Sequence, residues 1–189
     1  MIVCLGWGSL IWRRENLPVV EPWLQDGPSL PIEFARQSDN GRITLVIIAS
    51  RSVCPVLWAA LNVANLDDAR RVLSEREGPG VNLRRVAHWS RANSSDRPET
   101  AMIGAWAEEK GFEAVVWTAL GPRFGGASGR VPTETEVVSY LNTLNGEQRA
   151  DAEKYVRCAP AQIRTPYRAA IETALGWKPL ALESCCSSD

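Results

Sequence analysis

The sequence predicts an α+β protein whose sheet is closed or strongly curved. Strand-like segments fill most of the first 120 residues, one helix is inserted among them, and helical periodicity dominates after residue 130. Strands followed by helices are typical of the α+β class. The length of 189 residues fits one domain. We expect that domain to cover residues 1–182, with a helical extension from about residue 131 and a disordered tail at 183–189.

The expected strands precede residue 121. The turn Asp39-Asn40-Gly41 lies between two apolar runs and is a strong hairpin signal. We expect strands over residues 2–5, 30–38, 42–49, 56–63, 81–89, 103–107 and 113–120. Several prolines and glycines predict a mostly irregular segment at 13–29, and the polar residues 90–100 predict a surface loop.

Helices are predicted from capping residues and from periodicity. Asn65 is the expected N-cap of the first helix, which ends at Gly78-Pro79. Thr133 and Glu136 form a capping box for a second helix that reaches residue 144. Two more helices are expected over about residues 147–156 and 165–175, and the glycine-rich residues 125–129 are expected to be a flexible link.

Charge and cysteine content exclude several classes of protein. The net charge is −1 and no basic run occurs, so we expect neither a nucleic-acid nor a membrane partner. The 12-residue apolar run at the N-terminus is too short to cross a bilayer, and its charges follow it, unlike those of a secretion signal. Five cysteines without a C-x-x-C spacing predict no disulfide framework and a cytoplasmic location. Cys4 and Cys54 are expected to be small core residues.

Most familiar catalytic and cofactor sites are also excluded. The chain has one histidine, His88, so a multi-histidine metal site is impossible. We expect His88 to be a partly exposed strand residue beside Trp89. The first glycine pair is followed by Ile11 where a dinucleotide-binding loop has glycine, and residues 125–130 lack the lysine of a phosphate loop. We therefore expect no metal and no cofactor.

One residue of the first helix stands out. At roughly 100° per residue, Leu66, Ala69 and Leu73 fall on one face, and Glu77 extends this apolar stripe. Glu75 falls on the opposite face, where we expect its charged side chain to be exposed to solvent. A half-buried carboxylate at a helix C-terminus is expected to have a raised pKa, which suits a general base that later acts as an acid. Alternatively, Glu77 lies in solvent or pairs with an arginine at position 84 or 85.

The loop after the first strand is the second candidate. Glycines at positions 6 and 8 let backbone N–H groups converge on an anion such as a carboxylate. A tight turn without a ligand would use the same glycines.

Two segments together resemble a known superfamily. The first is the run Leu5-Gly6-Trp7-Gly8-Ser9-Leu10-Ile11-Trp12. It resembles the Gly-Tyr-Gly-Ser-Leu signature of the γ-glutamylcyclotransferase superfamily, and its Ile-Trp extension is similar to the glutathione-degrading ChaC branch. The second is the run Leu73-Ser74-Glu75-Arg76-Glu77-Gly78, which resembles the superfamily segment that ends in Arg/Gln-Glu-Gly. Between these two segments, residues 34–38 and 42–45 are similar to the strands that follow the first motif in the ChaC branch.

The resemblance implies a fold and a reaction. The fold is a small mixed β-barrel with flanking helices. In the reaction, the α-amine of a γ-glutamyl group attacks its own γ-carbonyl, which gives 5-oxoproline and a free amine or amino acid. The substrate-binding residues would be Gly6, Trp7, Gly8, Ser9 and Leu10, and the amides near residues 8–10 would hold the glutamyl α-carboxylate. Glu77 would be the catalytic acid and base, without a metal or cofactor.

The chain also departs from the family. Trp7 stands where the family usually has tyrosine, and the helical region after residue 130 has no obvious counterpart. Arg36 either shapes the substrate pocket or pairs on a strand. Glutathione, another γ-glutamyl amino acid, a γ-glutamyl amine and a γ-glutamyl-capped intermediate all remain open as substrates, and the oligomeric state is not predicted.

Two other functions fit the same residues. One is a binding module on the same fold that holds a γ-glutamyl or carboxylate group without catalysis. The other is an amide hydrolase or acyl transferase that uses Glu77 with an outside nucleophile.

Overall fold

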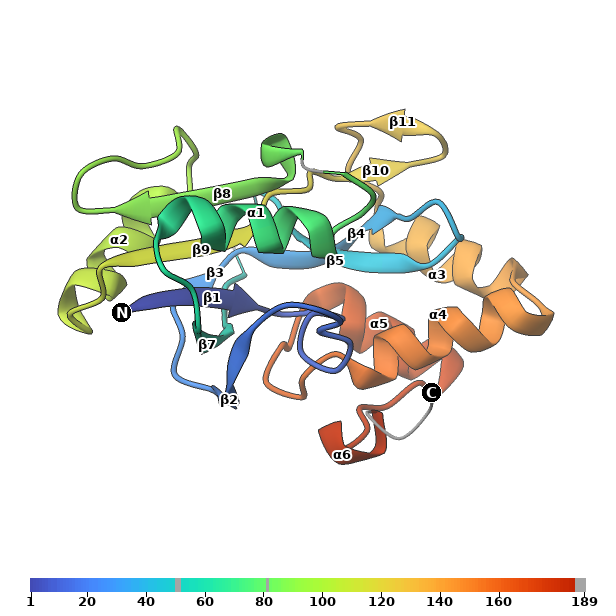
Figure 1. Cartoon of the computed structure of the whole chain (residues 1–189). Coiled ribbons are helices and arrows are strands. Elements are labelled where there is room, and N and C mark those ends of the chain that lie inside the picture. The colour runs from blue at the N-terminus through green and yellow to red at the C-terminus, as the bar shows by residue number, and fades with distance from the viewer. Residues whose placement is uncertain (50–51, 81, 186–189) are drawn as a thin grey trace. The chain divides into compact units, whose positions relative to one another are not determined.

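The computed structural model describes residues 1–49, 52–80 and 82–185 (Figure 1). The α+β class is confirmed, because sheets and helices both occur in the described chain. Closure of a barrel and a single domain remain predictions. The chain divides into two compact units. The first comprises Met1–Gly6, Arg14–Leu30 and Pro55–Leu120, and the second comprises Trp7–Arg13, Pro31–Cys54 and Gly121–Asp189.

The first unit is built on a mixed sheet. Among the described residues this sheet has five strands in the order β2-β7-β1-β9-β8. Their bounds are Val19–Leu24 (β2), Leu57–Leu61 (β7), Ile2–Gly6 (β1), Ala114–Thr118 (β9) and Val86–Ser90 (β8). Strand β1 pairs antiparallel with β7 and parallel with β9, and all five of its residues are buried. A central strand covered on both faces explains its continuous apolar sequence.

The expectation of an irregular segment at residues 13–29 was wrong over β2. This strand pairs with β7 alone within the described sheet, and its register shifts between Val20 and Leu24. Pro22 lies in that interval. An edge strand with an irregular register tolerates a proline, which cannot donate a ladder hydrogen bond. The prolines therefore indicated an edge strand and not the absence of a strand.

Two helices pack on this sheet (Figure 1). Helix α1 spans Leu66–Arg76, and its N-cap Asn65 accepts a hydrogen bond from the amide of Asp68 at 2.9 Å, as predicted. Helix α2 spans Thr100–Glu109, so the strand predicted over 103–107 was wrong. Ile103 and Ala107 are both fully buried and lie one helical turn apart.

The segment between β8 and α2 is partly ordered into a hairpin. Ser90 donates its amide to Asn93 O, and Ser95 donates to His88 O, both at 2.8 Å. The loop expected over residues 90–100 is therefore shorter than predicted. The strand expected at 81–89 begins at Val86, after a 3₁₀ turn at Leu83–Arg85, and residue 81 lies outside the described residues.

The second unit has its own sheet, in the order β11-β10-β4-β5 over the described chain. The bounds are Ala127–Ser128 (β11), Arg123–Phe124 (β10), Ile32–Gln37 (β4) and Ile43–Ile47 (β5). The turn predicted between β4 and β5 is confirmed, with Gly41 at φ 82°. The flexible link predicted at 125–129 was wrong, because Gly125 and Gly126 form the turn of the β10–β11 hairpin at φ 59° and 80°.

The two remaining strands are short. β3 (Ser29–Leu30) and β6 (Cys54–Pro55) have two residues each. They lie where the chain passes from one unit to the other.

Helices complete the second unit. They are α3 (Glu134–Thr143), α4 (Gly146–Cys158), α5 (Pro166–Leu175) and α6 (Leu182–Cys185). The capping box of Thr133 and Glu136 is present at α3, and Pro166 is at the first turn of α5. Helix α4 packs on β5, and α5 packs on β4 and α3. The predicted disordered tail begins inside α6, and residues 186–189 lie outside the described residues.

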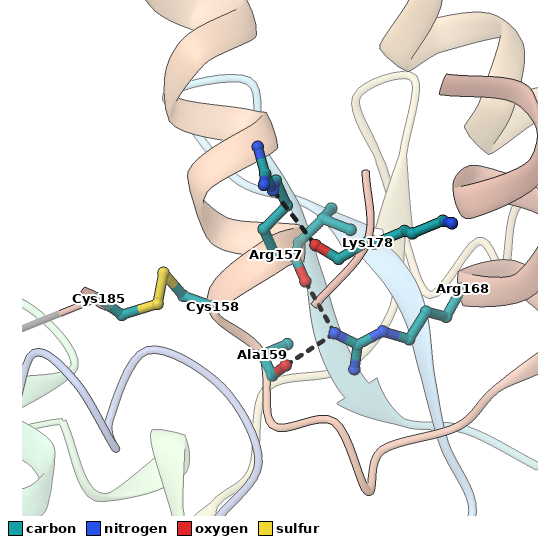
Figure 2. The surroundings of a disulfide bond; sticks show 7 residues. Arg157, Cys158, Ala159, Arg168, Lys178 and Cys185 are labelled. Atoms are coloured by element: carbon teal, nitrogen blue, oxygen red, sulfur yellow. Dashed lines mark hydrogen bonds between the residues drawn. A yellow bond between two sulfur atoms is a disulfide. The ribbon is translucent and has the colours of Figure 1, made fainter. Parts of the chain in front are cut away.

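A disulfide joins Cys158 at the end of α4 to Cys185 in α6, with the two Cα atoms 5.7 Å apart (Figure 2). The expectation that the cysteines form no disulfide was therefore wrong for this pair. Cys4 and Cys54 are free and buried, as predicted. Near the disulfide, Arg168 is 2% exposed and donates to the carbonyl oxygens of Val156 and Ala159, which lack helical partners at the end of α4.

No described helix combines the length and the apolar character needed to cross a membrane.

Candidate functional site

Glu77 lies at the C-terminal end of α1, and its side chain is 10% exposed. Its Oε1 accepts hydrogen bonds from Arg76 Nη1 and from Thr118 Oγ1, each at 3.2 Å. The bond from Arg76 is also an ion pair. Thr118 is the last residue of β9, so a strand and a helix together hold the carboxylate. The solvent alternative is excluded by this burial.

The backbone around Glu77 explains how the side chain is placed. Helix α1 packs on β8 and β9, and Leu73, one turn before Glu77, is fully buried. Arg85 donates to the backbone oxygen of Glu77 at 3.3 Å, not to its carboxylate. Gly78 has φ 150°, and a Cβ there would lie 2.2 Å from Arg85 Nη1. Glycine at 78 therefore allows both the turn and the close approach of Arg85.

Cys4 carries a thiol whose pKa responds to the charge of Glu77. It is fully buried in β1. Burial raises the pKa of the Cys4 thiol well above its usual range, and the negative charge of Glu77 raises it further, while Arg76 lowers it. A thiol kept protonated is a poor nucleophile. Cys4 is therefore a structural residue.

The glycine-bearing loop belongs to the second unit except for Gly6, which ends β1 and pairs with Leu57. Trp7 is 5% exposed and donates from its indole Nε1 to Leu45 O at 3.3 Å. After Gly8 the chain turns: Ile11 N donates to Gly8 O at 3.0 Å, and Arg13 N donates to Ser9 O at 2.7 Å. The indole of Trp7 therefore has a buried structural role.

Leu10, the last residue of the predicted binding loop, is buried. With Ser9 it lies in the turn that these hydrogen bonds close. The amides that the resemblance assigns to substrate binding come from this ordered turn and not from an extended segment.

Arg36 lies on β4 and is half-buried. Its Nη1 donates to Gly121 O at 2.9 Å, and its backbone oxygen accepts from Thr44 Oγ1 at 3.2 Å. The guanidinium thus holds the chain where it enters β10, which favours the structural alternative for this residue.

His88 is half-buried on β8 beside Trp89, as predicted. Its Nδ1 lies 3.1 Å from Ser95 Oγ and its Nε2 lies 2.9 Å from Asn93 Oδ1. These groups could form a nucleophile, base and orienting amide. However, Ser95 Oγ also accepts from the His88 backbone amide at 2.9 Å, and the three residues are partners in one hairpin. We interpret these hydrogen bonds as contacts that stabilise the hairpin.

A cleft of about 610 Å³ lies beside this hairpin and is lined in part by Trp89, Ser95 and Thr100. In the described part of the chain, no group of three or more histidine, cysteine, aspartate or glutamate side chains is placed to hold a metal ion.

Sequence reasoning missed two residues, one that contacts the candidate acid and one that contacts the candidate loop. Thr118 binds the Glu77 carboxylate from 41 positions away, and Tyr155 contacts the glycine loop from α4. Tyr155 lies outside the segments that carry the resemblance. Both were strand or helix residues in the sequence-based prediction, and no local pattern distinguishes them.

Comparison with family models, with curated proteins and with solved structures finds no match to this chain. Function is therefore inferred from the residues and their contacts.

Proposed function

We propose that the protein is a γ-glutamylcyclotransferase-type enzyme, with Glu77 as the general acid and base. The observation that supports the proposal is the placement of Glu77, a 10% exposed carboxylate held by Arg76 and Thr118. A carboxylate in a fixed orientation at the edge of solvent can exchange protons with a bound substrate. The small mixed β-barrel with flanking helices belongs to the same proposal.

The reaction forms one bond and breaks one bond within the substrate. The α-amine attacks the γ-carbonyl carbon of the same glutamyl group, and a C–N bond closes the five-membered ring. Glu77 accepts a proton from the attacking nitrogen and passes a proton to the leaving nitrogen, whose C–N bond breaks. The products are 5-oxoproline and a free amine or amino acid. No water or redox partner enters this balance.

The protein mainly has to hold a reactive conformer, because both reacting groups belong to one molecule. In the proposal, the amides at Gly8, Ser9 and Leu10 bind the glutamyl α-carboxylate. The turn closed by the Ile11 and Arg13 amides supports this role by ordering the loop.

The test is release of 5-oxoproline from glutathione, other γ-glutamyl amino acids and γ-glutamyl amines. For the substrate that turns over, Glu77→Gln is expected to lower kcat by about 100-fold or more, since a positioned acid–base group contributes roughly 10² to 10⁴. Glu75→Gln is the matched control, because Glu75 is exposed on α1 and pairs with Arg71. The enzyme proposal fails if wild type and Glu77→Gln are equally inactive on every compound. Free glutamate in place of 5-oxoproline would indicate an outside nucleophile.

A non-catalytic carboxylate-binding module is the second candidate. It is favoured by the ion pair itself, because Arg76 and Thr118 already occupy Glu77 Oε1. Calorimetry with glutamate, 5-oxoproline and γ-glutamyl dipeptides separates the two functions. Tight binding without turnover would support the module.

A further inference from the structure

We infer that Tyr155 is a positioning residue for the loop at residues 7–12, and that its hydroxyl fixes the backbone that binds the substrate carboxylate. The carboxylate part of this inference rests on the proposed function. The positioning part rests on contacts within the second unit alone.

Tyr155 is fastened to β5 by its hydroxyl. The side chain is 5% exposed, and Oη accepts a hydrogen bond from Leu45 N at 3.2 Å. Leu45 O accepts the indole N–H of Trp7 at 3.3 Å. Among the described strands β5 pairs with β4 alone, so both groups of Leu45 lie on its open edge. One residue of an edge strand thus connects the loop with α4.

Gly8 lies directly against the same hydroxyl. A Cβ at position 8 would lie 2.4 Å from Tyr155 Oη and 3.4 Å from Cζ. The first distance is far inside van der Waals contact, and the second is an ordinary contact. Position 8 therefore has no room for a side chain, and the hydroxyl oxygen of Tyr155 is the atom that a Cβ would meet too closely.

The tyrosine ring has two further contacts, one with Trp12 and one with Arg42. Trp12, at the end of the same loop, packs edge-on against it with the ring centroids 5.6 Å apart. The Arg42 guanidinium lies 5.7 Å from the ring centroid, a cation–π contact. Both contacts oppose a movement of the ring that would admit a larger residue at position 8.

Two substitutions, alone and combined, test whether the Tyr155 hydroxyl positions the loop. Tyr155→Phe keeps the ring contacts and removes only Oη, so the Leu45 amide loses its partner and the loop is less fixed. We expect about 5- to 10-fold weaker binding of 5-oxoproline and a higher KM with a smaller change in kcat, the size of one lost hydrogen bond. Gly8→Ala is expected to weaken binding by more than tenfold. In the double variant the 2.4 Å clash is gone, so binding should recover relative to Gly8→Ala.

Tyr140→Phe is the matched control. Tyr140 Oη donates to Gly41 O at 2.7 Å, so the control removes a comparable hydrogen bond at a different glycine of the same unit. It should leave the binding of 5-oxoproline unchanged.

Hydrogen exchange of residues 7–13, measured without ligand, separates this inference from the proposed function. Tyr155→Phe should speed exchange there, and Tyr140→Phe should not. If wild type neither binds nor releases 5-oxoproline while exchange responds as expected, the proposed function fails and Tyr155 still positions the loop. If exchange is unchanged in Tyr155→Phe and the double variant is no better than Gly8→Ala in thermal stability or binding, the inference is overturned.

Discussion

A buried carboxylate in the second unit shows how one residue can connect two elements. Glu33 on β4 is 2% exposed and accepts hydrogen bonds from Thr165 Oγ1 at 2.5 Å and from Tyr167 N at 3.4 Å. Thr165 is the N-cap of α5, so Glu33 satisfies groups at the start of that helix. Burial raises the pKa of Glu33 above 4.5, although these hydrogen bonds oppose the shift.

The raised pKa predicts a pH dependence of stability. The folded state holds the Glu33 proton more tightly than the unfolded state, so its contribution is fully present below the unfolded pKa of 4.5. That contribution is lost as pH rises through the folded pKa. Relative to Glu33→Gln, the free energy of unfolding of wild type should therefore fall as the pH rises above 4.5. Urea denaturation of both proteins measures this difference. Parallel pH profiles, or a relative gain by wild type, would contradict it.

Helix α2 shows how packing decides an element that local pattern leaves ambiguous. The segment Ile103–Ala107 is a short apolar run, which fits a strand or a buried helix equally well. The packing of Gly104 shows why the helix needs glycine here, since a Cβ at this position would lie 2.5 Å from Trp89 Nε1 on β8. The indole can thus lie directly on the helix backbone.

This contact predicts that Gly104→Ala is destabilising. Alanine favours a helix over glycine by about 1 kcal/mol, but overpacking a rigid indole costs roughly 1–3 kcal/mol. We expect the packing cost to exceed the gain in propensity, with a net loss measured by urea denaturation. The control Ala105→Gly, at the next and exposed position, measures the propensity effect alone. A more stable Gly104→Ala would show that the helix can shift away from Trp89.

At the scale of the whole molecule, the disulfide ties the end of the described chain to α4. Cys158 and Cys185 are 27 positions apart. The segment between them is also held by hydrogen bonds, from Arg157 Nε to Lys178 O at 3.2 Å and from Leu180 N to Arg157 O at 2.8 Å. Figure 2 shows the first of these beside the disulfide.

Closing a loop of this length is expected to stabilise the protein by about 3–4 kcal/mol, mainly through the unfolded chain. A dithiol reductant should therefore lower the thermal midpoint of wild type. Cys158→Ser should have a similarly low midpoint and should not respond to the reductant. An equal response in both proteins would show that another bond is being reduced.

Local signals in the sequence were sufficient for several elements and for part of the candidate site. The caps Asn65 and Thr133 marked the starts of α1 and α3, and Gly41 marked the turn between β4 and β5. The apolar stripe of α1 placed Glu77 beside the core. These features depend on residues within about four positions of one another, so periodicity and turn chemistry reveal them.

Contacts between distant positions were decided only by the tertiary structure. The sequence left the partner of Glu77 open between solvent and the arginines at 84 and 85, whereas the folded chain supplies Arg76 and Thr118. Tyr155 reaches Leu45 across 110 positions. The sequence by itself therefore determined the fold class, most elements and one candidate acid. The fold determined what surrounds that acid and the loop, because a side chain's partners depend on which surfaces pack together and not on its neighbours in the chain.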